Sequence, residues 1–497
     1  MPHILMATSE AVPFAKTGGL ADVCGALPLE LSRLGHPTTL IIPAYEQVLQ
    51  SGQPIEDTDI YFDIPIANRI VQGRLLSSRL PDSDVTVYLV RHDDYFARPQ
   101  LYGENGKDYA DNCERFVFFS RAVLEAIRLL DLSVDVLHVN DWQTGLIPAY
   151  LNINYAHARG YEDIVSIMTI HNMSYQGRFW HWDMALTGLD WKYFNWHQME
   201  FYGELNLLKT GLVFADAITT VSPRYAQEIQ QSPLGCGLEG VLQQRRNVLR
   251  GIINGVDYSV WNPRTDEFIA QPYDATEWQP GKAACKAALQ QAVGLPTRPG
   301  VPLIGIISRL VDQKGLDLIV PLMKKRLSQS DTQWVILGTG DPRYHEALAQ
   351  IAREFPQQVA VKLEFNTPLS HMVEAGADMF LMPSLFEPCG LNQLYSLKYG
   401  TVPIVHAVGG LADTIVNASE EGMHSGIANG FAFTEYSPEA LEAAFDRAWQ
   451  IYTHQPTVWQ RLVQTGMEQD WSWRSSAAKY VALYEDTIAR VRPTVCA

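Results

Sequence analysis

The chain has 497 residues, 47% of them hydrophobic, and its formal net charge at pH 7 is -17. This length and apolar content are typical of a globular protein of two or three domains and exclude an intrinsically disordered chain. The negative charge argues against nucleic acid or an anionic membrane as the main partner, because both repel an acidic surface. No apolar run is long enough to span a bilayer.

The first half of the chain alternates apolar runs with amphipathic segments. Runs with the length of buried strands lie at residues 4–8, 39–43, 85–90, 134–139, 165–170, 217–221 and 250–253. Several are continuously apolar, which is typical of strands covered on both faces. Helical patterns such as 21–34 and 112–130 lie between them. This alternation predicts a parallel sheet with crossover helices.

A proline-rich, polar stretch at residues 261–302 interrupts the alternation. It contains one helical pattern, 282–293, and we interpret it as the crossing between two domains. Strand-like runs resume at 301–308, 334–337, 359–364, 379–382 and 403–405, and an amphipathic helix follows at 471–491. We predict an α/β protein of two parallel-sheet domains, 1–262 and 263–474, that face a cleft. Ligands bind such sheets at the carboxyl ends of the strands.

The cysteines indicate the redox compartment. Six are scattered along the chain without a C-x-x-C pair: Cys24, Cys113, Cys236, Cys285, Cys389 and Cys496. This spacing resembles neither a disulfide framework nor a zinc site, so we expect a reducing, cytosolic location. The segment after Met1 lacks the basic region and apolar run of a signal peptide. A plastid location stays open if a transit peptide has been removed.

The segment Lys16-Thr17-Gly18-Gly19-Leu20-Ala21-Asp22 follows the first predicted strand. Paired glycines let a ligand approach the backbone, and the start of the next helix offers N–H groups that suit a phosphate. Lys16 adds a mobile positive charge. The alternative is a glycine turn with a surface lysine. Residues 409–414 differ from residues 18–23 at one position only and again follow an apolar run.

Two motifs of the second half also suit a phosphorylated ligand. Arg309 and Lys314 follow a predicted strand and together suit a diphosphate, although solvated surface cations are the alternative. The segment Glu387-Pro388-Cys389-Gly390-Leu391 precedes a helical run, so its amides can receive phosphate oxygens while Glu387 accepts hydrogen bonds from sugar hydroxyls. The alternative for Glu387 is an acid that suits the helix dipole. We expect Cys389 to be a packed small residue and not a nucleophile.

Further candidates share the position after a predicted strand: Asp141 and Trp142, His171 and Asn172, and Gly340. His171 can act as a general acid or hydrogen-bond donor, or it can be purely structural. Two Asp-x-Asp pairs, at 57–59 and 82–84, lie in polar, turn-like segments, and we interpret them as solvated acids and not as metal ligands. The chain has neither the G-x-G-x-x-G nor the G-x-x-x-x-G-K-[ST] motif, so no dinucleotide or P-loop site is indicated.

Residues 179–202 are dense in aromatic side chains, among them Trp180, Trp182, Trp191, Tyr193, Phe194, Trp196 and Phe201. Sugar rings have apolar faces that pack on such rings. For most of these residues we expect the alternative, a small satellite core under a long loop.

Together these motifs resemble those of a known family. Lys16 to Asp22, Thr169-Ile170-His171-Asn172, Ser308-Arg309-Leu310 with Gln313-Lys314-Gly315, and Glu387 to Leu391 stand in the order found in bacterial glycogen synthases and plant starch synthases. The chain resembles this family almost from end to end. The resemblance implies a GT-B fold, in which two Rossmann-like domains face a cleft and residues 475–497 pack back on the first domain.

The resemblance also implies a reaction. ADP-glucose would donate glucose, with retention of configuration, to the non-reducing end of an α-1,4-glucan, without a metal or other cofactor. The first domain would bind the acceptor and the second the donor. The catalytic residues would be His171, Arg309, Lys314 and Glu387. Donor contacts would come from Lys16, Gly18, Gly19, Asp22, Arg309, Lys314, Gly340, Phe365, Cys389, Gly390 and Leu391, and sugar or acceptor contacts from Tyr102, Asp141, Trp142, Asn172 and Asn254.

The chain departs from the family pattern at several positions. Asn140 and Gln143 stand where the family often has histidine, and Tyr395 stands where related GT-B families carry a second glutamate. Tyr395 fits the bacterial and plant synthases and counts against the more distant families. The alternatives are another retaining GT-B glycosyltransferase with a different donor or acceptor, and a glucan-binding protein without activity. The intact charged positions argue against the second alternative.

Overall fold

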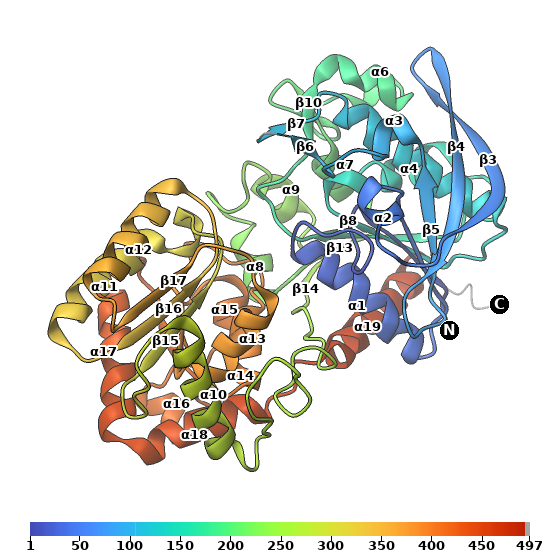
Figure 1. The fold of residues 1–497 in the computed structure, drawn as a ribbon. Helices are drawn as coiled ribbons and strands as arrows, with labels where there is room; N and C mark the ends of the chain where they lie inside the picture. The colour runs from blue at the N-terminus through green and yellow to red at the C-terminus, as the bar shows by residue number, and fades with distance from the viewer. Residues whose placement is uncertain (105, 493–497) are drawn as a thin grey trace. The chain divides into compact units, whose positions relative to one another are not determined.

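The computed structural model describes residues 1–104 and 106–492, and it divides the chain into two compact units (Figure 1). Unit 1 comprises Met1–Gly255 together with Trp473–Ala497, and unit 2 comprises Val256–Ser472. The sequence predicts these divisions after residues 262 and 474, a few residues later than the structure places them. Cys496 and the rest of 493–497 lie outside the described residues.

Unit 1 is built on a nine-stranded sheet with the order β14-β13-β9-β8-β1-β2-β5-β4-β3. Neighbouring strands are parallel except that β4 runs antiparallel to β5 and β3. The strands are β1 Ile4–Ala7, β2 Thr38–Pro43, β3 Glu56–Ile66, β4 Arg69–Arg79, β5 Thr86–Arg91, β8 Val136–Asn140, β9 Val165–Ile170, β13 Ala217–Thr220 and β14 Leu249–Gly251. The five central strands β1, β2, β8, β9 and β13 are buried along their whole length, as their continuous apolar runs predict.

The long antiparallel pair β3 and β4 is not predicted by the sequence pattern. Buried and exposed residues alternate at the end of β3, as in a sheet with one face in solvent. Such a strand has no continuous apolar run, which is the signal that marks the buried strands. The interpretation of residues 57–59 as a turn-like segment is therefore wrong, because they lie in β3 beside an irregularity of the ladder. Asp57 pairs there with Arg74 of β4, 2.8 Å away.

Helices pack around this sheet: α1 Gly19–Arg33, α2 Glu46–Leu49, α3 Asp93–Phe96, α4 Asn112–Leu129, α5 Ile147–Asn154, α6 Met184–Thr187, α7 Leu207–Phe214, α8 Pro223–Glu228, α9 Glu239–Gln244 and α19 Trp473–Val491. Short 3₁₀ turns are η1 Trp142–Thr144, η2 His181–Asp183 and η3 Trp191–Tyr193. Two small sheets complete the unit, the hairpin β6 Gly103–Glu104 with β7 Lys107–Asp108, and the sheet of β10 Arg178–Trp180, β11 Glu200–Phe201 and β12 Glu204–Asn206.

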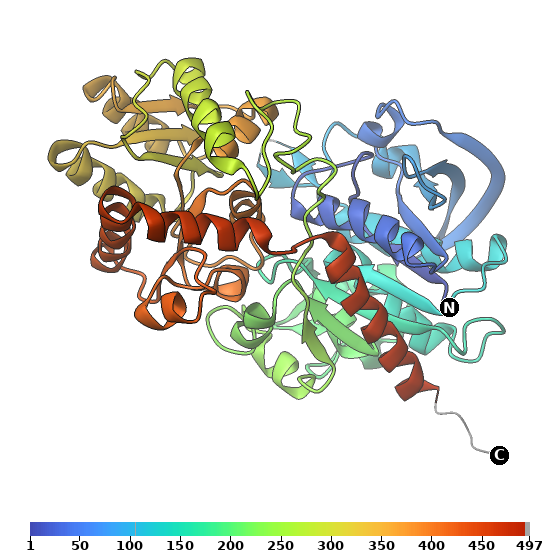
Figure 2. The same ribbon diagram turned by 90° about the horizontal axis from the view of Figure 1, so that it is seen from below.

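The last helix, α19, belongs to unit 1, as the sequence analysis predicted. It contacts α1 and β9, and Figure 2 shows it in red beside the blue N-terminal helix. The Tyr484 hydroxyl lies 2.8 Å from Nδ1 of His138 in β8, and the Ser476 hydroxyl donates a hydrogen bond of 2.7 Å to the carbonyl of Ile253. These contacts fix α19 to the sheet.

Unit 2 is a six-stranded parallel sheet with the order β17-β16-β15-β18-β19-β20. Its strands are β15 Leu303–Ile307, β16 Gln333–Leu337, β17 Val359–Lys362, β18 Met379–Met382, β19 Val402–His406 and β20 Phe431–Phe433. Its helices are α10 Trp278–Val293, α11 Leu316–Gln329, α12 Pro342–Glu354, α13 Thr367–Gly376, α14 Asn392–Lys398, α15 Gly409–Thr414, α16 Glu420–His424, α17 Pro438–His454 and α18 Pro456–Glu468, with a 3₁₀ turn η4 Asp312–Lys314.

Both faces of this second sheet carry a hydrophobic core. Trp334 and Ile336 of β16 belong to one buried cluster, and the intervening Val335 belongs to the other. Since successive side chains of a strand point to opposite faces, the two clusters lie on opposite sides of the sheet.

In each unit the strand order reverses beside the first strand. β1 lies between β2 and β8, and β15 lies between β16 and β18. Open parallel sheets bind ligands outside the carboxyl ends of strands at such a reversal, so the segments that follow β1, β8, β15 and β18 are the candidate binding segments. Within the described residues, no helix combines the length and apolarity needed to cross a bilayer.

Candidate active site

In unit 1 a buried carboxylate holds the loop that follows β1. Glu10 accepts hydrogen bonds from the amide of Thr17 at 2.5 Å, the Thr17 hydroxyl at 2.6 Å and the amide of Gly18 at 3.3 Å. These bonds fix the turn that leads into α1. Gly18 caps α1 without a side-chain hydrogen bond. The Ala21 amide donates to the Gly18 carbonyl at 3.3 Å, so the amides of Gly19 and Leu20 are the ones that stay available to an anion.

The paired glycines of this loop have no packing neighbour. A Cβ atom added at Gly18 or Gly19 would meet no protein atom within 4 Å. The fold of unit 1 therefore does not itself require glycine at these two positions. Beside them the Lys16 ammonium lies 2.7 Å from the Asp22 carboxylate, and the lysine side chain is about half exposed.

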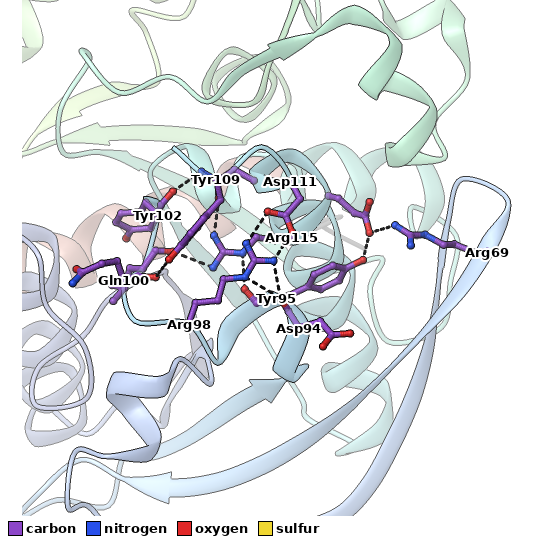
Figure 3. Close-up of polar contacts among 12 residues, drawn as sticks. Arg69, Asp94, Tyr95, Arg98, Gln100, Tyr102, Tyr109, Asp111 and Arg115 are labelled. Atoms are coloured by element: carbon purple, nitrogen blue, oxygen red, sulfur yellow. Dashed lines mark hydrogen bonds and ion pairs between the residues drawn. The ribbon is translucent and has the colours of Figure 1, made fainter. Parts of the chain in front are cut away.

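Tyr102 joins this loop to a second segment of unit 1. Its hydroxyl donates a hydrogen bond of 2.6 Å to Glu10 and lies 2.8 Å from the Ser9 hydroxyl. The buried Arg115 and Asn112 hold the segment that carries Tyr102: Arg115 donates to the carbonyl of Leu101 at 3.0 Å, and Asn112 donates to the carbonyl of Tyr102 at 2.9 Å (Figure 3). Burial raises the pKa of Tyr102 well above its ordinary value, so its hydroxyl stays a neutral donor.

The segment after β8 carries a buried acid in an unusual conformation. Asp141 has φ 55°, in the left-handed region that disfavours residues other than glycine. Its carboxylate accepts a hydrogen bond of 2.8 Å from the His171 amide, which ties the ends of β8 and β9 together. Burial raises the pKa of Asp141 to about 7, against the opposing effect of its backbone hydrogen bonds.

The His171 ring is oriented by Asn140. The Asn140 amide nitrogen donates to the carbonyl of Ala7 at 3.1 Å, and its Oδ1 lies 2.9 Å from Nε2 of His171. A carbonyl can only accept, so the amide nitrogen must face Ala7 and Oδ1 must face the ring. His171 therefore carries its proton on Nε2 and offers Nδ1 as an acceptor. Burial lowers the His171 pKa to about 3, which keeps the ring neutral.

Three candidates of unit 1 remain, of which Trp142 and Asn172 directly follow Asp141 and His171 in the chain. Trp142 is buried, with ring centroids 6.5 Å from Tyr102 and 5.7 Å from Phe179. Asn172 accepts a hydrogen bond of 2.9 Å from the Ser174 amide and so caps its own turn. Asn254 is buried, and its Oδ1 has no hydrogen-bond partner among the described residues.

In unit 2 a pocket of about 130 Å³ lies where β15 and β18 end. Its lining is Ile307, Ser308, Lys314, Leu381, Met382, Ser384, Glu387, Gly390, Leu391 and Asn392. Four of the predicted site residues are in this set: Lys314, Glu387, Gly390 and Leu391. The Ser308 hydroxyl is buried and has no hydrogen-bond partner among the described residues, so it is free to bind a polar group in the pocket.

An ion pair joins the two predicted motifs of this pocket. The Lys314 ammonium lies 2.5 Å from Oε2 of Glu387, and the Ser384 hydroxyl donates to the same oxygen at 3.0 Å. Gln313, beside Lys314, donates to the carbonyl of Phe386 at 2.9 Å, which holds the two loops together. Arg309 is exposed outside the pocket lining, and its guanidinium contacts Gln313 at 3.3 Å.

The second Gly-Gly-Leu-Ala-Asp segment supports the Glu387 loop. The Gly410 amide donates to the carbonyl of Glu387 at 3.2 Å, and a Cβ atom at Gly410 would lie 2.0 Å from the carbonyl oxygen of Cys389. Glycine is required here by close packing of two backbones. The repeat thus has different physical causes in its two copies, since the copy in unit 1 has open space where this one has a neighbour.

In addition to Arg309, three predicted donor residues of unit 2 lie outside the pocket lining. The Gly340 amide donates to Nε2 of His345 at 2.9 Å, Phe365 is exposed in the segment before α13, and Cys389 is buried. Glu10, Ser384 and Asn392 are not among the site residues predicted from the sequence. Ser384 and Asn392 flank the Glu387 motif, and extending that motif to both strand and helix would have included them.

Residues 3–244 match the family model of the starch synthase catalytic domain, and residues 291–455 match that of glycosyl transferases group 1. The chain is 47% identical to a glycogen synthase of Rhodopirellula baltica over 98% of both chains, and 45% identical to one of Syntrophotalea carbinolica over 98% of this chain and 99% of the relative. The chain belongs to the glycogen and starch synthase family.

The solved structures agree with this family. The catalytic domain of starch synthase IV from Arabidopsis thaliana, described as bound to ADP and acarbose, superposes with a TM-score of 0.88 at 31% identity, over 98% of this chain and all of that chain. The predicted GT-B fold and the predicted glucosyltransferase class are confirmed. Among the described residues, no three His, Cys, Asp or Glu side chains gather in a group that would hold a metal ion.

Proposed function

We propose that the protein transfers glucose from ADP-glucose to the non-reducing end of an α-1,4-glucan, with retention of configuration and without a metal. The Lys314–Glu387 pair in the pocket of unit 2 carries this proposal, because it offers a cation for a phosphate next to a carboxylate for sugar hydroxyls. The similar starch synthase IV, described as bound to ADP and acarbose, supports a nucleotide donor and a glucan acceptor.

The donor is assigned to the following groups. Lys314 and Arg309 counter the charge of the diphosphate as it leaves, in place of a metal. The Ser308 hydroxyl, which has no partner among the described residues, and the Gly390 and Leu391 backbone line the same pocket. Further donor contacts are proposed for Lys16, Gly18, Gly19, Asp22, Gly340, Phe365 and Cys389.

The glucose and acceptor are assigned to groups of unit 1. The neutral His171 ring offers Nδ1 to a sugar hydroxyl, since Asn140 holds the proton on Nε2. Trp142, buried beside Tyr102 and Phe179, is assigned to the acceptor side, and the Asn254 Oδ1 has an unused acceptor position in the described structure. Tyr102, Asp141 and Asn172 complete the proposed sugar and acceptor contacts.

The chemistry that these residues support is front-face transfer. Retention by double displacement needs a carboxylate nucleophile on the face opposite the leaving group. The Glu387 carboxylate is paired with Lys314 in the pocket assigned to the phosphates, and the Asp141 and Glu10 carboxylates are engaged in backbone hydrogen bonds. In the proposed step the bond from C1 to the diphosphate breaks, the acceptor hydroxyl attacks C1 from the same face, and the departing phosphate takes its proton.

A direct assay tests the proposed function. Purified protein is incubated with ADP-glucose or UDP-glucose, each with glycogen and with a short maltooligosaccharide, and nucleoside diphosphate release is followed. We expect turnover with ADP-glucose and either acceptor, a new α-1,4 linkage by NMR, and no loss of rate with a chelator. Faster turnover with UDP-glucose, or no turnover with any pair, contradicts the proposal.

The proposed location is a reducing, cytosolic compartment. Cys24, Cys113, Cys236 and Cys285 are free thiols. Free thiols persist in reducing compartments, whereas the cysteines of secreted proteins are usually paired in disulfides. Fractionation of cells that express the tagged chain tests this assignment.

A further inference from the structure

Three tryptophans form an exposed cluster in unit 1, outside the proposed active site. Trp180 ends β10, Trp182 lies in η2 and Trp191 begins η3. Their exposed fractions are 62%, 56% and 43%. The ring centroids of Trp180 and Trp182 lie 6.4 Å apart and those of Trp182 and Trp191 lie 5.4 Å apart, both pairs edge to face. We call these three residues the tryptophan surface.

This arrangement corrects an expectation from the sequence. We expected most of the aromatic residues of 179–202 to form a satellite core, and Phe201 is indeed buried. The prediction is wrong for the tryptophan surface and for Trp196, which are exposed. Large apolar side chains that gather on a surface mark a binding site, because their exposure to water is unfavourable.

The scaffold below the tryptophan surface is well fixed. β10 pairs with β12, and Arg178 of β10 forms an ion pair with Glu204 of β12. The Asp190 carboxylate caps η3 by accepting a hydrogen bond of 2.8 Å from the Lys192 amide. The rings are therefore presented in defined positions, which lowers the entropy lost when a ligand binds.

The chemistry of this surface favours a neutral sugar chain. Sugar rings pack their apolar faces on aromatic rings, and their hydroxyls need polar partners at the edge. His181 and Asp183 lie between the tryptophans in sequence, and Lys192 follows Trp191. A single-stranded nucleic acid also stacks on aromatic rings but needs a positively charged groove, and this chain has a net charge of -17.

Strand β10 links the tryptophan surface to the proposed acceptor contact at Trp142. A Cβ atom at Gly177 would lie 2.4 Å from the Trp142 ring, so the residue before β10 packs directly on Trp142. Phe179 in β10 also contacts Trp142, with centroids 5.7 Å apart, and the next residue is Trp180. Successive side chains of a strand point in opposite directions. In β10, the Phe179 ring therefore faces Trp142 and the Trp180 ring faces solvent.

We propose that the tryptophan surface is a second binding site for α-glucan chains, adjacent to the acceptor contact at Trp142 but separate from the catalytic groups. This inference rests on the proposed function, because the glucan is the acceptor assigned there. A polymer held at this surface would keep its chain ends near unit 1 between turnovers. The site would thus favour polymeric over short acceptors.

The test compares the triple variant Trp180→Ala/Trp182→Ala/Trp191→Ala with the wild type and with Tyr61→Ala, which removes an aromatic ring that is 54% exposed on β3. Affinity electrophoresis in gels that contain glycogen gives the dissociation constant. We expect glycogen binding to weaken at least about tenfold in the triple variant and to stay unchanged in Tyr61→Ala. The KM for glycogen should rise, while kcat and the KM for maltotriose stay at wild-type values.

The outcomes separate this inference from the proposed function. Wild-type glycogen affinity in a triple variant with normal turnover overturns the second site and leaves the function standing. Loss of wild-type turnover with every donor would instead count against the function. Sedimentation velocity tests whether a second copy of the chain occupies the tryptophan surface. If the wild type is a dimer, and the triple variant is a monomer with unchanged glycogen affinity, the inference is also overturned. The single variant Trp180→Ala should show a smaller loss of glycogen affinity in the same direction. It replaces the triple variant in the test if the triple variant does not fold.

Discussion

The Lys314 ammonium and the Glu387 carboxylate lie 2.5 Å apart, and their side chains are only 19% and 9% exposed. The two residues come from different loops, after β15 and after β18, at the reversal of the strand order in unit 2. A buried ion pair of this kind constrains both partners, because removal of one leaves the other charge without compensation. In this structure Lys314 is thus coupled more closely to Glu387 than to Arg309, whose guanidinium contacts Gln313.

Lys314→Ala and Glu387→Gln should therefore act as one unit. Each single variant should lose roughly ten- to hundredfold in kcat, the size expected for a charge-assisted hydrogen bond. The double variant should lose much less than the product of the two. Steady-state kinetics with ADP-glucose gives the values, and Lys324→Ala, an exposed lysine of α11, is the matched control. Losses that multiply would show that the residues act independently.

A second coupled pair is expected in unit 1. Glu10→Gln removes the carboxylate that receives the Thr17 and Gly18 amides and the Tyr102 hydroxyl. We expect a higher KM for ADP-glucose and a free energy of unfolding lower by about 1–3 kcal/mol, since an NH2 group replaces one of the two acceptor oxygens that these partly buried donors share. Tyr102→Phe should cause a smaller change that adds little to Glu10→Gln.

The control for this pair is Tyr109→Phe. The Tyr109 hydroxyl donates to the carbonyl of Gln100 at 3.3 Å on the exposed side of the same segment. This variant should keep the wild-type KM and unfolding midpoint. Equal effects of Tyr109→Phe and Tyr102→Phe would mean that the hydroxyls serve the segment as a whole and that Glu10 does not position the loop.

The sequence predicted the buried part of the fold well, because burial on both faces leaves a continuous apolar run. Runs 165–170 and 379–382 have the same bounds in β9 and β18. The apolar runs also placed Lys314 and Glu387 after strands, and the structure shows that these strands, β15 and β18, are neighbours. Glu10 could not be predicted in this way, since its role depends on Tyr102, 92 residues further along the chain. Nor does an aromatic-rich sequence show which rings its loops turn toward solvent, as Trp180 demonstrates.

Lys16→Ala separates ligand binding from stability. Lys16 and Asp22 form a largely exposed ion pair, and such pairs contribute little to folding. We therefore expect an unchanged unfolding midpoint, together with a donor KM raised roughly tenfold or more by the loss of a charge-assisted contact. Asp22→Asn, which keeps the lysine, should affect the KM less. An unchanged donor KM in Lys16→Ala would reject the phosphate role.

Asp141 should make stability depend on pH. Burial raises its pKa from 3.8 to about 7, so in this window the folded protein binds more protons than the unfolded chain. Stability should then fall as pH rises through the window, by at most about 1.4 kcal/mol per pH unit from this group. Asp141→Asn keeps an acceptor for the His171 amide and should remove this contribution. Urea unfolding at several pH values across the window measures it, and an equal slope in both proteins would contradict the assignment.

The last prediction concerns the pair of Asn140 and His171. The neutral amide oxygen of Asn140 accepts from Nε2, and burial holds the His171 pKa at about 3. Asn140→Asp places a carboxylate against the ring, which favours the imidazolium, so the His171 pKa should rise. The charged ring would lose Nδ1 as an acceptor, and the acid limb of the rate profile should move to higher pH.

NMR titration of the imidazole resonances measures this shift, with His171→Gln used to assign them. Asn140→His is the matched control, since it adds no carboxylate and should leave the His171 pKa low. If the His171 pKa rises in both variants, the cause is a loosened contact to Ala7 that admits water, and not the charge of the new carboxylate. If it rises in neither, Asn140 does not set the protonation of His171, and the assignment of Nδ1 as the sugar-facing acceptor fails with it.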